Sequence, residues 1–121
     1  MVKVKRGTLK AILEAARNTY PREFIALLGS TKGRVLDEFI VLPSTFGESL
    51  SSIRADLLPY NAGSIGSVHS HPGPNARPSK ADLAMFRAMG EIHLITAYPF
   101  SLESTRAYDA AGKELELEVV E

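Results

Sequence analysis

Hydrophobic residues along the chain recur at two different intervals, one typical of helices and the other typical of strands. Apolar side chains fall at helical spacing between Thr8 and Tyr20, which predicts a helix that Thr8 caps and Pro21 ends. A second stretch with helical spacing, SKADLAMFRAMG, predicts a helix that begins at Ser79 and is ended by Gly90. The chain is therefore expected to contain two main helices.

Short apolar runs rich in strand-forming residues make up most of the remaining chain. They predict strands over residues 23–30, 34–43, 64–71, 92–99, 104–110 and 114–121. The turn STKG is expected to join the first two strands as a hairpin, and residues 44–63 to form a loop with a short strand or helical turn. This order predicts a single α/β domain over residues 1–121, with a mixed, mostly antiparallel β-sheet flanked by two helices.

Composition and charge exclude several functional classes. Fourteen basic residues balance fourteen acidic ones, so no global field favours nucleic acid. A basic cluster at Lys3, Lys5, Arg6 and Lys10 is expected to be a solvated surface. The absence of cysteine excludes disulfides, a cysteine nucleophile and the cysteine-ligated zinc of nucleobase deaminases. The first residues lack an apolar signal core and no run is long enough to span a membrane, so we expect a cytoplasmic protein with no membrane partner.

Two of the three histidines lie one residue apart at the end of the predicted strand 64–71. Because side chains two residues apart on a strand share a face, His69 and His71 are expected side by side, with Ser70 pointing away. Such a pair can supply two adjacent ligands to a metal ion. Two exposed histidines, or two that are hydrogen-bonded within the fold, would explain the pair as well, and the third histidine, His93, is expected to be structural.

A serine and an aspartate follow at the start of the second predicted helix. Ser79 and Asp82 have the spacing of a capping box, in which each side chain bonds a free backbone N–H of the first turn. Asp82 also completes a set of two histidines and one carboxylate, which leaves zinc one position for water. Hydrolysis then needs a carboxylate base. Glu23 opens the otherwise apolar run EFIALLG and is the candidate, although an exposed glutamate at a strand edge explains it equally well.

The spacing of these residues resembles the signature of a known enzyme family. His69-x-His71, seven residues, Ser79, two residues and Asp82 match the pattern of the JAMM (MPN-plus) zinc metalloproteases. Prolines at both ends of the intervening loop, and an upstream strand that begins with Glu23 and ends in Leu-Leu-Gly, also match. The resemblance covers nearly the whole chain and is closest to the small stand-alone archaeal members. It implies a JAMM/MPN fold, which has a cytidine deaminase-like architecture.

The resemblance also implies a role for each residue of the motif. His69, His71 and Asp82 would ligate one Zn2+ ion, with water in the fourth position. Glu23 would hold and deprotonate this water and pass the proton to the leaving amine. Ser79 would hydrogen-bond the developing oxyanion or the water while it caps the helix.

The activity implied by the resemblance is hydrolysis of the amide bond after the C-terminal Gly-Gly tail of a ubiquitin-like protein of the small archaeal modifier type. The tail would lie extended beside a sheet edge near His69, and residues 44–63 would contact it. The alternatives are a peptidase that trims sulfur-carrier protein precursors, a non-catalytic MPN scaffold and an iron oxygenase with two histidines and one carboxylate. The resemblance also implies a lack of strict linkage specificity, because family members specialised for one linkage often carry a larger insertion after the second helix, where this chain has a short connection. The oligomeric state stays open, with a homodimer as one option.

Overall fold

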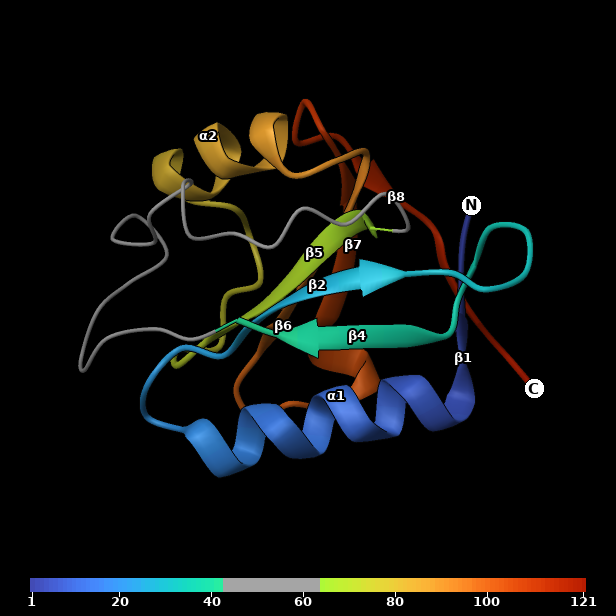
Figure 1. The fold of residues 1–121 in the computed structure, drawn as a ribbon. Coiled ribbons are helices and arrows are strands. Elements are labelled where there is room, and N and C mark those ends of the chain that lie inside the picture. Colours follow the sequence, from blue (N-terminus) through green and yellow to red (C-terminus); the bar gives the residue numbers. More distant parts are fainter. Residues whose placement is uncertain (43–63) are drawn as a thin grey trace.

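The computed structural model describes residues 1–42 and 64–121, so the loop expected at 44–63 lies outside the described residues (Figure 1). Its helices are α1 (Arg6–Thr19), α2 (Lys80–Ala88) and the short 3-10 helix η3 (Leu102–Ser104). Its strands are β1 (Val2–Lys5), β2 (Ile25–Gly29), β3 (Val35–Leu36), β4 (Glu38–Val41), β5 (Ser64–His71), β6 (Ile92–Ala97), β7 (Thr105–Asp109), β8 (Glu114–Leu115) and β9 (Leu117–Val120).

Six strands form the main sheet, in the order β4-β2-β5-β6-β7-β8. β5 and β6 run parallel and the other neighbours run antiparallel, so the predicted mixed, mostly antiparallel sheet is confirmed. The predicted hairpin is the antiparallel pair β2 and β4. Strand β5, which carries the two adjacent histidines, lies inside the sheet and is paired on both sides.

The two main helices cover opposite faces of this sheet, α1 on one side and α2 on the other (Figure 1). Side chains alternate along the strands, so Val68 and Leu94 pack in the cluster that contains the buried face of α1. Their neighbour Ile95 faces the other way and packs in a cluster with Phe86 of α2. Because both faces are covered, β2 and β6 are buried along their whole length, as their continuous apolar runs indicate.

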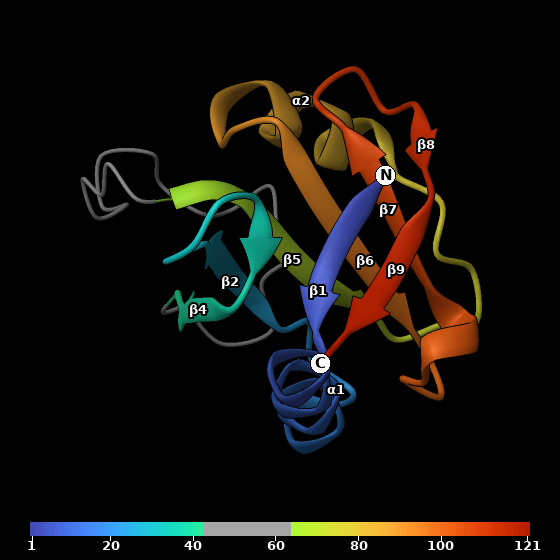
Figure 2. The ribbon, with the colours of Figure 1, turned by 90° about the vertical axis from the view of Figure 1, so that its right-hand side faces the viewer.

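A second, three-stranded parallel sheet with the order β3-β1-β9 was not predicted (Figure 2). The lysines of the first residues predicted only a basic surface, but the valines of β1 are buried while Lys3 and Lys5 are exposed. The runs 34–43 and 114–121, each predicted as one strand, are both divided between the two sheets. Hydrophobic pattern marks a strand but does not say which sheet it joins, so the divisions at Asp37 and Glu116 were missed.

The helix ends differ in how well they were predicted. Helix α1 begins at Arg6 rather than at Thr8, which is buried inside the first turns, so the predicted Thr8 cap is wrong. Helix α2 begins after Ser79 with the predicted capping box. Gly90 ends this region with φ 115°, and a Cβ there would lie 2.6 Å from the Ile65 carbonyl oxygen, so only glycine fits. Among the described residues no helix is both long and apolar enough to cross a membrane.

Candidate metal centre

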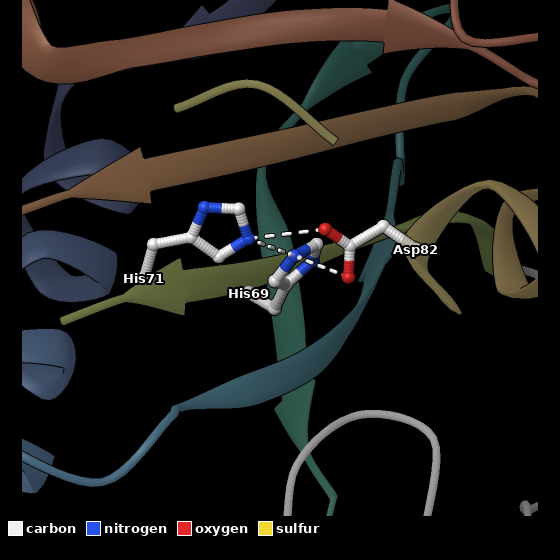
Figure 3. Close-up of side chains that lie close together, drawn as sticks. All are labelled: His69, His71 and Asp82. Atoms are coloured by element: carbon white, nitrogen blue, oxygen red, sulfur yellow. Dashed lines mark hydrogen bonds and ion pairs between the residues drawn. The ribbon is translucent and has the colours of Figure 1, made fainter. Parts of the chain in front are cut away.

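The end of β5 brings His69 and His71 to the face of the sheet that α2 covers (Figure 3). Their side chains share this face as predicted, with ring centroids 4.9 Å apart. Ser70 points to the opposite face, where its Oγ accepts a hydrogen bond of 2.8 Å from the Phe24 N–H. His69 is 1% exposed, whereas the side chain of His71, at the strand end, is 16% exposed.

The capping box of α2 brings Asp82 to the two histidines. The Asp82 N–H donates to Ser79 Oγ at 3.1 Å, and Asp82 Oδ2 accepts from the Ser79 N–H at 2.8 Å. These bonds hold the carboxylate over the end of β5, in a position where only 3% of the residue is exposed. The predicted capping and ligand roles of Asp82 are therefore compatible, because its two oxygens serve both.

Two ring nitrogens and the two oxygens of one carboxylate converge at this point (Figure 3). The two Nε2 atoms lie 3.1 Å apart, His69 Nε2 lies 3.1 Å from Asp82 Oδ1, and His71 Nε2 lies 3.0 Å from Asp82 Oδ2. Ligands on the corners of a tetrahedron at zinc bond lengths lie about 3.3 Å from one another, so each of these three distances is close to the separation that zinc requires. The donor set fits one Zn2+ ion, and three protein ligands leave a fourth position open, as in catalytic zinc sites.

Electrostatics also favour a cation here. Burial by itself would raise the pKa of the Asp82 carboxyl, but hydrogen bonds with His69 and His71 hold that pKa well below its ordinary value. Burial would likewise lower the pKa of His71, but the hydrogen bond to Asp82 raises it above the ordinary value. The carboxylate is therefore ionised, and zinc must displace any proton on His71 to bind.

The outer nitrogen of His71 fixes the orientation of its ring. Nδ1 lies 2.8 Å from the backbone oxygen of Asn75, and because a carbonyl can only accept, Nδ1 carries the proton. This tautomer leaves the Nε2 lone pair for the metal. This partner of His71 was not predicted, since no pattern of side chains in the sequence reveals a backbone carbonyl. The Nδ1 atom of His69 is buried and has no hydrogen-bond partner within residues 1–42 and 64–121.

The proposed base, Glu23, lies next to the metal ligands but is not one of them. Ile25 pairs with His69 in the antiparallel register of β2 and β5, and the Ser70 N–H donates to the Phe24 oxygen one step further. The next position in this register sets Glu23 opposite His71, and cross-strand partners share a face. The charge of Glu23 also contributes to the raised pKa of His71. Glu23, a half-buried residue, is thus close enough to His71 for its charge to influence the metal ligands.

The remaining histidine is structural, as predicted. His93 is fully buried, its Nδ1 lies 2.7 Å from Ser67 Oγ, and its Nε2 lies 2.8 Å from the Gly90 oxygen. Its ring stacks on Phe86 at a centroid distance of 4.2 Å. Phe86 and Met89 are buried in the core.

Comparison with known proteins agrees with the fold and with the donor set. Residues 5–110 match the model of the family described as prokaryotic homologs of the JAB domain, and the chain belongs to this family. A probable metalloprotease of Haloferax volcanii is 31% identical over 131 residues, covering 100% of this chain and 81% of the relative.

Two solved structures are more similar in sequence and share the fold. One, described as "JAMM: A Metalloprotease-like Zinc Site in the Proteasome and Signalosome", is 43% identical with a TM-score of 0.79 and covers 100% of this chain and 99% of its own. A JAB1/MPN domain protein from Archaeoglobus fulgidus is 44% identical with a TM-score of 0.81. The match covers 99% of this chain and 100% of that protein. The predicted family and the stand-alone archaeal type are confirmed.

Proposed function

We propose that this chain is a zinc-dependent metallopeptidase that hydrolyses the amide bond after the C-terminal Gly-Gly tail of a ubiquitin-like protein. The observation that carries the proposal is the three-ligand site with its open fourth position and Glu23 beside it. The zinc-site and metalloprotease descriptions of the relatives support hydrolysis of an amide. The ubiquitin-like substrate rests on the resemblance of the sequence motif to the JAMM enzymes.

The residues of the site can divide the chemistry among them. His69, His71 and Asp82 would hold a zinc ion, which would supply a Lewis acid to activate a water molecule and polarise the scissile carbonyl. Glu23 takes a proton from the attacking water and delivers it to the nitrogen of the leaving amine as the C–N bond breaks. The Ser79 Oγ accepts a hydrogen bond from the Asp82 N–H. The hydroxyl hydrogen of Ser79 is therefore available to donate to the oxyanion.

The position of the site limits how a substrate tail can lie. The expected sheet edge near His69 is absent from the described residues, because β5 is paired with β2 on one side and β6 on the other. On the β2 side the edge of the described sheet is β4, where Ile40 and Val41 are 46% and 57% exposed. An extended tail can add to β4 by main-chain hydrogen bonds, two strands from the ligands.

Cleavage of a defined conjugate tests the proposal. A ubiquitin-like protein joined through its Gly-Gly tail to a lysine side chain is incubated with the zinc-loaded chain, with a chelator, and with zinc added back. A parallel assay uses the same modifier with a linear C-terminal extension, as in a sulfur-carrier precursor. We expect cleavage after the second glycine that the chelator abolishes and zinc restores. Failure to cleave either conjugate, by a protein shown to hold one zinc ion, would contradict the proposed substrate.

Three further expectations from the sequence stay predictions. They are the cytoplasmic location, the lack of strict linkage specificity and the option of a homodimer. The first is checked by fractionation of cells, the second by cleavage of conjugates with different linkages, and the third by sedimentation.

A further inference from the structure

The loop between His71 and Ser79 supplies the hydrogen bond that orients His71. Its centre is the peptide group that joins Ala76 and Arg77. The N–H of this group, on Arg77, donates to Asn75 Oδ1 at 2.9 Å, and its carbonyl, on Ala76, accepts from the Tyr108 hydroxyl at 2.7 Å. Both ends of one peptide group are thus held, one by the preceding side chain and the other by a residue 32 positions away.

Tyr108 is firmly placed to hold this peptide. It lies on β7, two strands from β5 in the main sheet, and is 4% exposed. Its ring packs in a cluster with Phe86 and Ile95, and Ala76 of the loop packs against the same cluster. The Phe86 ring lies 6.2 Å from Tyr108 and 6.3 Å from His69. The packing of its ring in this cluster therefore fixes the position of the Tyr108 hydroxyl, in addition to its hydrogen bond to the loop.

The held peptide in turn determines where the carbonyl of Asn75 points. The Asn75 side chain is anchored through the Arg77 N–H, and the Asn75 backbone oxygen accepts the Nδ1–H of His71 at 2.8 Å. This bond selects the His71 tautomer that presents Nε2 to zinc. Without the Tyr108 hydroxyl, the loop keeps its Asn75 turn, the packing of Ala76 and the bond from the Tyr98 N–H to the Gly73 oxygen, but it loses the hydrogen bond that holds the Ala76 carbonyl to β7.

We propose that Tyr108 is a positioning residue of the metal centre, which acts through the Ala76–Arg77 peptide and the Asn75 carbonyl to hold His71 for zinc. The inference rests on the zinc site and is independent of the substrate. Burial raises the pKa of the Tyr108 hydroxyl, which favours the protonated form that donates to the Ala76 carbonyl.

The experiment removes this hydroxyl alone. Tyr108→Phe keeps the ring in its cluster, and Tyr20→Phe, which removes a hydroxyl from a tyrosine that is 46% exposed, is the matched control. Zinc affinity is measured by competition with a fluorescent chelator. In the zinc-loaded protein, NMR measures the exchange of the His71 Nδ1–H with water. We expect Tyr108→Phe to weaken zinc binding about tenfold and to speed the exchange of the His71 Nδ1–H with water. Tenfold is the lower end of the range that is usual when a metal ligand loses a residue that supports it. Tyr20→Phe should change neither.

A second variant tests the same route from the other side of the peptide. Asn75→Ala removes the anchor of the Arg77 N–H but keeps the backbone carbonyl, and it should also weaken zinc binding and speed the exchange of the His71 proton. If Tyr108→Phe lowers thermal stability but leaves both zinc affinity and this exchange unchanged, Tyr108 only packs in the core and the proposal is wrong. These readouts involve no peptide substrate, so they stand even if the proposed activity fails.

Discussion

The histidines of neighbouring strands β5 and β6 show how the same residue type serves structure in one place and metal binding in another. His93 on β6 uses both ring nitrogens within the fold. The Gly90 oxygen can only accept, so Nε2 carries the proton and Nδ1 accepts from the Ser67 hydroxyl. No lone pair is left for a metal, and burial lowers the pKa of His93 so that its ring stays neutral.

His69 and His71 on β5 are arranged in the opposite way. Their Nε2 atoms face each other and the buried Asp82 carboxylate, so ring nitrogens and carboxylate oxygens meet at one point where a metal ion can bind. Asp82 raises the pKa of His71, whereas the pKa of His93 is lowered. The contrast shows that the position of the lone pairs, and not burial, distinguishes a ligand histidine from a structural one.

The largest effect should come from removing a ligand. His71→Ala should weaken zinc binding by more than about 100-fold, beyond the usual cost of losing an outer partner, and abolish activity. His93→Gln, which keeps a donor for the Gly90 oxygen, should retain zinc. Competition with a chelator measures both affinities. Equal zinc affinity in the two variants would remove the distinction between the histidines.

Next in size is the loss of the base. Glu23→Gln should slow amide hydrolysis by about 10²–10⁴-fold, the usual contribution of a general base, because the amide cannot accept the proton of the attacking water. Zinc content should be unchanged, since Glu23 lies beside the ligand set and not within it. Single-turnover kinetics with metal analysis checks both points. A variant that cleaves at the wild-type rate would show that another group acts as base.

A smaller effect concerns folding stability. Zinc at 100 times its Kd should raise the free energy of unfolding by about 2.7 kcal/mol in the wild type and in His93→Gln. Asp82→Asn can keep the capping box but lacks the negative charge. The same zinc concentration should therefore raise the free energy of unfolding of this variant by less. Urea denaturation with buffered zinc gives the three increments. A full increment in Asp82→Asn would mean that its charge is not needed for binding.

The smallest effect is the pH dependence of stability due to His93. Burial keeps the pKa of this ring below its ordinary value of 6.5, so below this pH the unfolded chain binds a proton that the folded chain does not. Stability should therefore fall with decreasing pH, by at most about 1.4 kcal/mol per unit. Denaturation in a chelator between neutral and mildly acidic pH, compared with His93→Gln, isolates this slope. If stability falls equally with pH in the wild type and in His93→Gln, His93 does not cause the pH dependence.

The resemblance to the JAMM motif implied the metal ligands, and their local geometry is compatible with that assignment. The two-residue period of a strand places His69 beside His71, and the capping box places Asp82 in the first turn of the following helix. Only one tertiary contact, between the end of β5 and the start of α2, is needed to bring the three together. The proline-bounded loop between them is short, so the sequence already restricts this contact.

The elements that the sequence did not predict depend on contacts between distant residues. β1 was not predicted because its two buried valines alternate with exposed lysines, which indicated only a basic surface. This strand pairs with β9, at the other end of the chain. The bond from Tyr108 to Ala76 joins residues on separate elements, and Tyr108 in the sequence has the appearance of an ordinary core residue. Hydrophobic periodicity contains no information about such partners.

Anomalous diffraction at the zinc edge, from crystals grown with zinc, tests the central claim most directly. We predict one zinc peak per chain at about 2.0–2.2 Å from His69 Nε2, His71 Nε2 and an oxygen of Asp82, with no fourth side chain bound to the metal. A zinc ion bound elsewhere, a fourth protein ligand that closes the site, or no peak at this position would contradict the account.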